Sequence, residues 1–320
     1  MKPQIPLDQC ALYKCRNKRR LARLLQVSYP QLNDLLNSIS YRTKEHEKKD
    51  GKTRTIYVPQ DQLKRMQSRI KRLLERIEKP GWVFSGTKGR CHVDNGRYHQ
   101  DSRYFVVTDI SSFYDTCTRE MVYRFFIDTM QCTPDISECL TNLSAYTTDD
   151  KGSLIPTGSP CSQLVAFFAY QSMFKEVEEL ATAYGCRFSL YVDDLTISST
   201  GPIGNPKKLV KQLNKILRAY GHRLNPLKTR YYRPKESKII TGVALDGRGE
   251  LHIPNRLGKA VIDDFHDVLS GGDSKAPSLT GRIGAARQIV PSAFPEVERL
   301  ANEAAVNSMA CGGIANVGVT

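Results

Sequence analysis

Two adjacent acidic residues, Asp193 and Asp194, lie in the stretch RFSLYVDDLTIS between two short runs of alternating apolar and polar residues. Alternation with a period of two predicts a β-hairpin that carries this pair at its tip. Aspartate is common in turns, so an acidic turn by itself would explain an isolated pair. A metal site would need further ligands from elsewhere in the chain.

A third acidic residue, Asp109, ends the β-rich run YFVVTD. An antiparallel sheet with helices behind it can bring the end of this strand beside the hairpin, although 84 positions separate Asp109 from Asp193. Three neighbouring carboxylates repel one another unless a cation neutralises them. Oxygen ligands without nearby His or Cys favour Mg²⁺, and two such ions can activate an attacking hydroxyl and stabilise the leaving oxygen in phosphoryl transfer.

Helical and strand patterns surround these carboxylates in mixed order. Leucines at helical spacing predict two short amphipathic helices within residues 1–40, broken at Ser28-Tyr29-Pro30. HEKKDGKTRTIYVP predicts a hairpin that turns at Asp50-Gly51, and a polar stretch precedes the loop LIPTGSP. Further predicted elements are helices near 62–78, 119–130, 162–184, 206–220 and 256–309, and a β-like segment with a turn at Asp246-Gly247.

The formal net charge of +14 is concentrated near the N-terminus. Residues 1–80 contain 20 Lys and Arg against 8 Asp and Glu, which leaves +2 for all later residues. Concentrated positive charge attracts polyanions through counterion release, and nucleic acid is the polyanion that we expect. The alternative is a set of helices whose basic faces are simply solvated.

Length and composition narrow the class of protein. A chain of 320 residues with 40% hydrophobic residues predicts one large or two modest folding units. The sequence has no run of 18 apolar residues and no signal-peptide pattern at its N-terminus, so we expect a soluble cytoplasmic protein without a membrane partner. Nine cysteines without CxxC pairs suggest neither a zinc site nor a disulfide framework.

Taken in order along the chain, these motifs resemble those of bacterial retron-type reverse transcriptases. Tyr191-Val192-Asp193-Asp194 meets the Y-x-D-D box of that family, and TDISSFYD puts Asp109 at the upstream metal-binding aspartate. The resemblance covers roughly residues 20–300. It implies that Asp109 and Asp193 are the principal catalytic Mg²⁺ ligands, that Asp194 completes the cluster, and that two ions bind.

The resemblance also implies residues that bind the incoming deoxynucleotide. Lys52 and Arg54 belong to a stretch similar to the basic hairpin that holds the triphosphate, and Tyr114 matches the aromatic residue that blocks a ribose 2′-OH. Gly158, in IPTGSPCSQ, allows close approach of the backbone to nucleotide and template. Lys228, in RLNPLKTRYY, corresponds to a catalytic lysine near the departing pyrophosphate. Without this context, such lysines more often face solvent and Tyr114 is as readily a core residue.

Two further elements are similar to motifs of the retron subgroup. NGRYH, with Asn95 and His99, resembles N-A-x-x-H, and IITG, with Thr241 and Gly242, resembles V-T-G. Each differs from its motif by one small substitution, and we assign no role to these four residues.

The chain departs from the family pattern at three further positions. Thr157 replaces the glutamine of P-Q-G, Gln163 replaces the proline that commonly follows the serine, and Val192 replaces alanine. None of the three changes removes a predicted metal ligand.

The fold class implied is α+β, a right-hand polymerase of the reverse transcriptase type, with fingers, a palm built on an antiparallel sheet and a helical thumb. The expected segments are a basic helical region at 1–40, fingers at 41–108 and 119–160, palm at 109–118 and 161–250, thumb at 251–309 and a flexible tail at 310–320.

The implied function is an RNA-directed DNA polymerase that copies part of a cognate structured noncoding RNA. Priming from a guanosine 2′-OH would give branched msDNA, an RNA–DNA hybrid, in antiphage defence. The implied partners are this RNA and its DNA product, dNTPs and an effector protein encoded nearby. Two alternatives stay open: a defence-associated reverse transcriptase outside the retrons, with different priming or untemplated synthesis, and a catalytically idle RNA-binding antitoxin or scaffold.

Overall fold

The computed structural model describes residues 4–47, 51, 53–148, 152–270, 275–297 and 299–300. The chain forms two units. The first comprises Met1–Arg90 and Val106–Tyr231, and the second comprises Cys91–Phe105 and Tyr232–Thr320. Within the described ranges, no helix is at once long enough and apolar enough to cross a membrane.

The first unit begins with short helices and a long hairpin. Ser28 caps the second helix, with its side chain and that of Gln31 bonding reciprocally to backbone N–H groups, which explains the predicted break. Tyr41 and Tyr57, one from each strand of the hairpin, contact the ring of Tyr146. The elements are η1 (Leu7–Gln9), α1 (Lys18–Leu25), α2 (Tyr29–Leu36), β1 (Tyr41–Glu47), β2 (Thr53–Pro59) and α3 (Asp61–Leu74).

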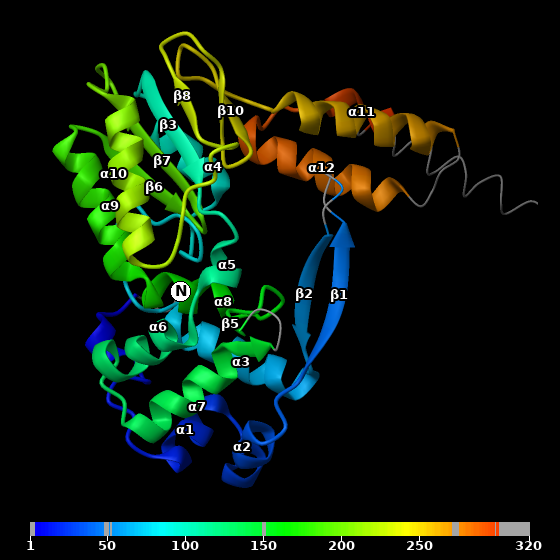
Figure 1. Ribbon diagram of the computed structural model, residues 1–320. Coiled ribbons are helices and arrows are strands. Elements are labelled where there is room, and N and C mark those ends of the chain that lie inside the picture. Colours follow the sequence, from blue (N-terminus) through cyan, green and yellow to red (C-terminus); the bar gives the residue numbers. More distant parts are fainter. Residues whose placement is uncertain are drawn as a thin grey trace, which may run out of the picture. The chain divides into compact units, whose positions relative to one another are not determined.

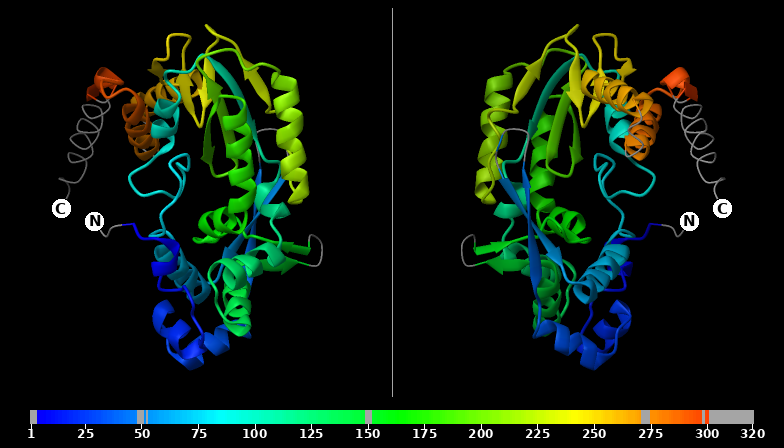
Figure 2. Two further views of the ribbon diagram at one scale, coloured as in Figure 1. Left: turned by 90° about the vertical axis from the view of Figure 1, so that its left-hand side faces the viewer. Right: turned by 90° about the vertical axis from the view of Figure 1, so that its right-hand side faces the viewer.

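A four-stranded sheet in the order β6-β7-β3-β8 forms the centre of the first unit. Helix α9 packs against β6, and α10 packs against α9 (Figures 1 and 2). The apolar residues of β6 and β7 are buried, in agreement with the predicted hairpin. The elements are β3 (Tyr104–Asp109), α9 (Gln171–Ala183), β6 (Arg187–Tyr191), β7 (Asp194–Ser199), α10 (Pro206–Ala219) and β8 (Arg230–Tyr232).

The stretch between β3 and α9 differs in part from the sequence prediction. The polar stretch before LIPTGSP contains a helix, α7, whose Ile136, Leu140 and Leu143 are buried at helical spacing. The helix predicted at 162–184 is interrupted at Tyr170, and the one predicted at 119–130 becomes a π-helix at Phe125. The elements are α5 (Phe113–Thr116), α6 (Arg119–Arg124), η2 (Phe125–Thr129), α7 (Pro134–Ser144), β4 (Tyr146–Thr148), β5 (Gly152–Leu154) and α8 (Ser162–Ala169).

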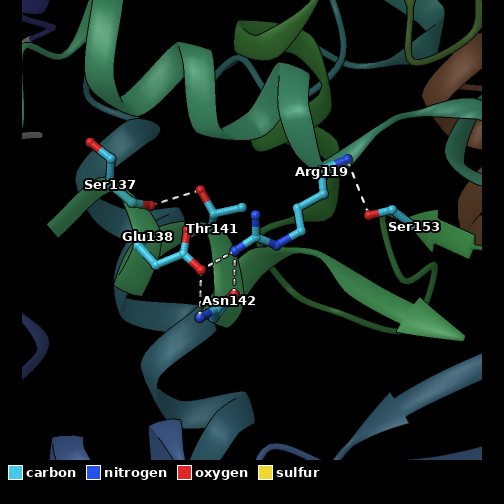
Figure 3. Close-up of polar contacts among 6 residues, drawn as sticks. All are labelled: Arg119, Ser137, Glu138, Thr141, Asn142 and Ser153. Carbon is cyan, nitrogen blue, oxygen red and sulfur yellow. Dashed lines mark hydrogen bonds and ion pairs between the residues drawn. The ribbon is translucent and has the colours of Figure 1, made fainter. Parts of the chain in front are cut away.

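Arg119 joins three of these elements through polar contacts (Figure 3). Its guanidinium donates to Glu138 and, at 2.8 Å, to Asn142 of α7. Its backbone N–H donates to the Ser153 hydroxyl of β5 at 3.2 Å. These contacts hold the strand that leads into the Pro/Gly-rich loop.

The second unit combines a small sheet with helices. Val93, Val243 and Ile289 form a buried cluster that links α4, β10 and α12, and α11 packs on α12 through Val261, Val268, Leu279 and Ile283. The predicted tail at 310–320 and the end of the predicted thumb lie outside the described residues. The elements are α4 (His92–Tyr98), β9 (Lys238–Ile240), β10 (Val243–Leu245), β11 (Leu251–His252), α11 (Asn255–Leu269) and α12 (Ala276–Ile289).

Candidate active site

Backbone hydrogen bonds position Asp109 beside the hairpin. The N–H of Ile110 donates to the carbonyl of Asp193 at 3.0 Å, and the N–H of Asn225 donates to the carbonyl of Asp109 at 2.9 Å. Asp109 is buried at the end of β3, with 5% of its surface exposed. The structure therefore brings the strand end and the hairpin tip together, as the sequence predicted.

The hairpin turns within two residues, Val192 and Asp193, because Tyr191 pairs with Asp194 across the strands. Val192 has a φ of 62°, which is the left-handed region and is unfavourable for a β-branched residue. Its N–H donates to the hydroxyl of Ser85 at 2.7 Å. This hydrogen bond helps to hold a strained turn that presents both carboxylates.

Burial and mutual repulsion make the pair of carboxylates hard to ionise. Desolvation raises the pKa of Asp194 to about 6, with the charges of Asp193 and Asp109 adding to it. Desolvation, followed by the charge of Asp109, also raises the pKa of Asp193, and nearby Lys228 and Arg54 oppose that rise. The site thus holds negative charge that a cation would stabilise.

Lys228 contributes one of these cations. Its Nζ lies 2.5 Å from Oδ2 of Asp109, and this bond raises the pKa of Lys228. The side chain of Lys228 is mostly exposed, whereas that of Asp109 is buried. Lys228, which the sequence placed near the leaving group, therefore also pairs with a predicted metal ligand.

The donor set fits a divalent cation. Oδ1 of Asp109 is buried and has no hydrogen-bond partner among the described residues. An orphaned carboxylate oxygen is costly unless a cation or water satisfies it. Together with the raised pKa values of Asp193 and Asp194, it favours a hard cation at this position.

A second acidic group lies in the second unit. Ligand atoms of Asp246, Glu250 and His252 lie within 4.8 Å of one another. Among the described residues, the ligand atoms of Asp109, Asp193 and Asp194 do not all lie within that distance of one another. Asp246 accepts hydrogen bonds from the N–H groups of Arg248 and Glu250 and contacts His252 at 3.0 Å. These bonds lower the pKa of Asp246 to about 2. Hydrogen bonds within a turn therefore explain why the three side chains lie together.

Two of the predicted nucleotide-binding residues lie within electrostatic range of Asp193. Burial and the charge of Asp193 raise the pKa of Tyr114, and Arg54 lowers it. The exposed side chain of Arg54 lies on β2. The third, Lys52, lies outside the described residues.

Gly158 lies tightly against the β1–β2 hairpin. A Cβ at this position would lie 2.3 Å from the carbonyl oxygen of Tyr57, so no other residue fits without movement of β2. The Ser162 hydroxyl donates to the carbonyl of Pro156 at 2.5 Å and closes the loop. Thr157 Oγ1, at the position that departs from P-Q-G, is buried without a partner among the described residues.

The two retron-like motifs meet in the second unit. Asn95 donates from Nδ2 to the Thr241 hydroxyl at 3.3 Å, and that hydroxyl donates to the carbonyl of His92 at 3.0 Å. Gly242 follows in the left-handed region, with a φ of 85°. His99 is fully buried, and its ring contacts Tyr98 and Phe105.

The substitution in NGRYH has a packing explanation. A Cβ on Gly96 would lie 3.2 Å from Cδ2 of Leu251 and 3.4 Å from Cβ of Val243. The alanine methyl of N-A-x-x-H would therefore make close contacts here, which Leu251 and Val243 would have to relieve by a small shift.

Sequence reasoning missed several residues that position the site. Ser85 holds the hairpin turn, Asn225 holds the Asp109 backbone, and Thr108 bonds Thr229 at 2.7 Å. Asn225 belongs to the stretch RLNPLKT, so the motif pointed to this residue. The motif did not indicate that its backbone N–H holds Asp109. Nothing in the sequence around Ser85 marks it.

A search of protein-family models matches residues 46–245 to the family described as reverse transcriptase (RNA-dependent DNA polymerase). Among curated proteins, the chain is 27% identical over 232 residues to the retron Se72 reverse transcriptase of Salmonella heidelberg, covering 70% of this chain and 60% of that protein. It is 23% identical to the retron Ec86 reverse transcriptase of Escherichia coli, covering 83% of this chain and 82% of the relative. For the Ec83 enzyme of the same organism, the identity is 24% and the coverage is 89% and 95%.

Among solved structures, telomerase from Candida albicans in complex with a fragment of telomeric RNA has a similar fold. The TM-score is 0.51 at 12% identity, over 82% of this chain and 55% of that chain. This likeness concerns the fold alone.

Proposed function

The chain belongs to the reverse transcriptases, the family of RNA-dependent DNA polymerases, and from this premise we propose that it copies part of a cognate structured RNA into DNA. The family match and the retron relatives confirm the predicted retron-type resemblance and the enzyme class. The family match and the telomerase likeness confirm the predicted fold class.

In the proposed reaction, a primer hydroxyl attacks the α-phosphate of a bound dNTP and pyrophosphate leaves. Asp109, Asp193 and Asp194 would hold two Mg²⁺ ions. When bound, these ions would favour ionisation of the hydroxyl and stabilise charge on the leaving oxygen. The observation that carries this proposal is the buried, unpartnered Oδ1 of Asp109, which is held beside the hairpin by the bond from Ile110 to Asp193.

The proposed role of Lys228 is to stabilise the departing pyrophosphate. Support comes from its exposed side chain, whose Nζ lies beside Asp109 and remains protonated because its pKa is raised. A fixed cation there stabilises developing negative charge on a phosphate.

Arg54, together with Lys52, is proposed to bind the triphosphate, and Tyr114 to exclude a 2′-OH. The electrostatic influence of Arg54 on Asp193 and Tyr114 supports a position near the nucleotide. Gly158 is proposed to allow close approach of the loop to β2 and the nucleotide, which its packing against Tyr57 supports.

The retron relatives support a finer proposal for the template and primer. We propose priming from a guanosine 2′-OH of the cognate RNA, a branched msDNA product, and action in antiphage defence with an effector protein. The contact of Asn95 with Thr241 supports a shared structural role for the two subgroup motifs.

Primer extension tests the proposed catalytic site. Asp193→Asn should lose dNTP incorporation on an RNA template with Mg²⁺, while binding of that RNA, measured by fluorescence anisotropy, stays close to that of the unmodified protein. Asp128→Asn makes the same chemical change at an exposed residue and should extend the primer normally. Extension by the Asp193→Asn variant would refute the assignment of the site.

Sequencing the nucleic acid that copurifies with the protein tests the priming mechanism. A small DNA that is released from RNA only by a 2′-5′ debranching enzyme is expected. A linear DNA product would instead favour a defence-associated reverse transcriptase outside the retrons.

A further inference from the structure

The residues after Pro80 have a net charge of only +2, but they include a strongly basic segment at 195–235. No Asp or Glu occurs between Asp194 and Glu236. All Lys and Arg residues of this segment that lie in the first unit are exposed. They are Lys207, Lys208, Lys211, Lys215, Arg218, Arg223, Lys228 and Arg230. The first six define what we call the α10 surface.

The structure places most of these charges on one helix. Leu209, Leu213 and Leu217 are buried, so the opposite side of α10 faces solvent. The side chain of Asn205 caps the first turn by accepting from the N–H of Lys208 at 2.9 Å. With 14 residues, α10 is about 21 Å long at 1.5 Å per residue.

The acidic residues of the neighbouring helix α9 contact groups other than the basic side chains of the α10 surface. Glu176 accepts from the hydroxyl of Tyr220, Glu178 accepts from that of Thr182, and Glu179 pairs with Lys175. In the described part of the chain, none of the residues of the α10 surface forms an ion pair. No ion pair among the described residues therefore neutralises their positive charge.

A hollow of about 810 Å³ borders this surface. Lys207, Lys211, Arg218 and Arg223 line it, together with polar groups that include Asn214 and Thr229. A second hollow, lined also by Lys208 and Lys215, shares Lys211, Asn214 and Arg218 with the first. The basic residues thus line concave surface as well as an exposed ridge.

We propose that the α10 surface, whose residues are distinct from the three aspartates, binds the phosphodiester backbone of a nucleic-acid duplex, an inference that rests on the proposed function. About 21 Å of duplex carries roughly six phosphates on each strand, whereas a single dNTP offers only three phosphates close together. The spread of basic residues along the whole helix matches a duplex backbone. The occupant that we propose is a base-paired stem of the cognate RNA.

The salt dependence of binding tests this proposal. Lys208→Gln combined with Lys215→Gln removes two charges that lie on α10 and take no part in the proposed chemistry. Binding of a fluorescent RNA stem-loop, measured between about 50 and 200 mM salt, should show a slope of log K on log salt that is shallower by roughly 1 per lysine. The same stem as an RNA–DNA hybrid tests the other duplex: a shallower slope with the hybrid alone would overturn the assignment to an RNA stem.

The control is Lys175→Gln on the neighbouring helix α9. Because Lys175 already pairs with Glu179, this substitution should leave the slope unchanged. A second pair, Lys211→Gln with Arg218→Gln, guards against a local folding defect in the first pair. The proposal is wrong if both pairs of substitutions bind the RNA stem with the unmodified slope. Primer extension by the unmodified protein separates this outcome from failure of the proposed function, since that protein would still polymerise.

Discussion

The carboxylates of the site are held in unequal environments. One oxygen of Asp109 pairs with Lys228, and the other is buried without a partner among the described residues. Asp193 and Asp194 have raised pKa values because burial and neighbouring charge disfavour ionisation. At the scale of single residues, the site therefore stores electrostatic repulsion that cation binding would relieve.

This repulsion predicts how stability depends on pH. The pKa of Asp194 is about 6 in the folded chain and near 4 in an unfolded one. The folded state therefore binds more protons between these values, and the free energy of unfolding falls as pH rises through that window. Without metal, Asp194→Asn should raise this free energy by about 1 kcal/mol at neutral pH, after allowance for solvent screening.

Thermal unfolding measures this effect. Mg²⁺ should raise the Tm of the unmodified protein more at neutral pH than near pH 5, and it should raise that of Asp194→Asn less. The exposed Asp128→Asn variant should respond to Mg²⁺ like the unmodified protein. An equal Mg²⁺ response in the Asp194→Asn and unmodified proteins would contradict the predicted role of Asp194.

At the scale of elements, the site depends on contacts between segments that are remote in sequence. The hairpin tip contacts the end of β3 and the segment that contains Ser85, and the loop of Gly158 lies against β2. The two hairpins, β1–β2 and β6–β7, contribute to the site for different reasons. The first carries Arg54, and the second presents the carboxylates.

Gly158→Ala tests the packing of the loop on β2. The added Cβ would lie 2.3 Å from the carbonyl of Tyr57, so β2 and Arg54 must shift. Because small displacements of positioning groups are costly in catalysis, we expect kcat/KM for dNTPs to fall by about tenfold to a hundredfold. Steady-state primer extension measures this fall.

Gly204→Ala provides the matched control, because a Cβ there has no neighbour within 4 Å. It should leave kcat/KM unchanged. Normal kinetics for the Gly158→Ala variant would show that the loop can move away from β2 without consequence for the nucleotide.

At the scale of the whole molecule, basic residues gather on at least two surfaces of the described part of the first unit. One is the α10 surface. Another is a cleft of about 590 Å³ beside α3, lined by Arg65, Arg69 and Arg72 among others, within the basic region that the sequence predicted to bind phosphates. Arg69 donates to the carbonyl of Leu24 at 2.7 Å and so has a structural role.

Arg65→Gln combined with Arg72→Gln should weaken RNA binding and make its salt slope shallower by roughly 2. Arg124→Gln, at an exposed arginine paired with Glu120, should not change the slope. If the cleft beside α3 and the α10 surface bind RNA independently, combining Arg65→Gln and Arg72→Gln with Lys208→Gln and Lys215→Gln should add the two changes in slope. If the variant with Arg65→Gln and Arg72→Gln has the same salt slope as the unmodified protein, residues 61–74 do not belong to the predicted phosphate-binding region.

Sequence alone determined the local elements with strong periodicity. Alternation in RFSLYVDDLTIS predicted the β6–β7 hairpin, and spaced leucines predicted α1 and α2. It missed α7, whose apolar residues are diluted by Ser, Thr and Asn, and the interruption at Tyr170, whose surroundings are apolar on every side. Periodicity reports which face of a segment is buried, and it weakens where a segment is polar or buried all round.

Sequence also determined the identities and order of Asp109, Asp193 and Asp194, which together with the other motifs in order indicated the family. Tertiary structure alone decided how the residues are held: Ser85 bonds Val192 across 107 positions, Lys228 pairs with Asp109 across 119, and Asn95 bonds Thr241 across 146. It also decided that the lysines of α10 share a solvent-exposed side and form no ion pair with a described acidic residue. Such contacts depend on the packing of distant segments, which no local pattern of residues encodes.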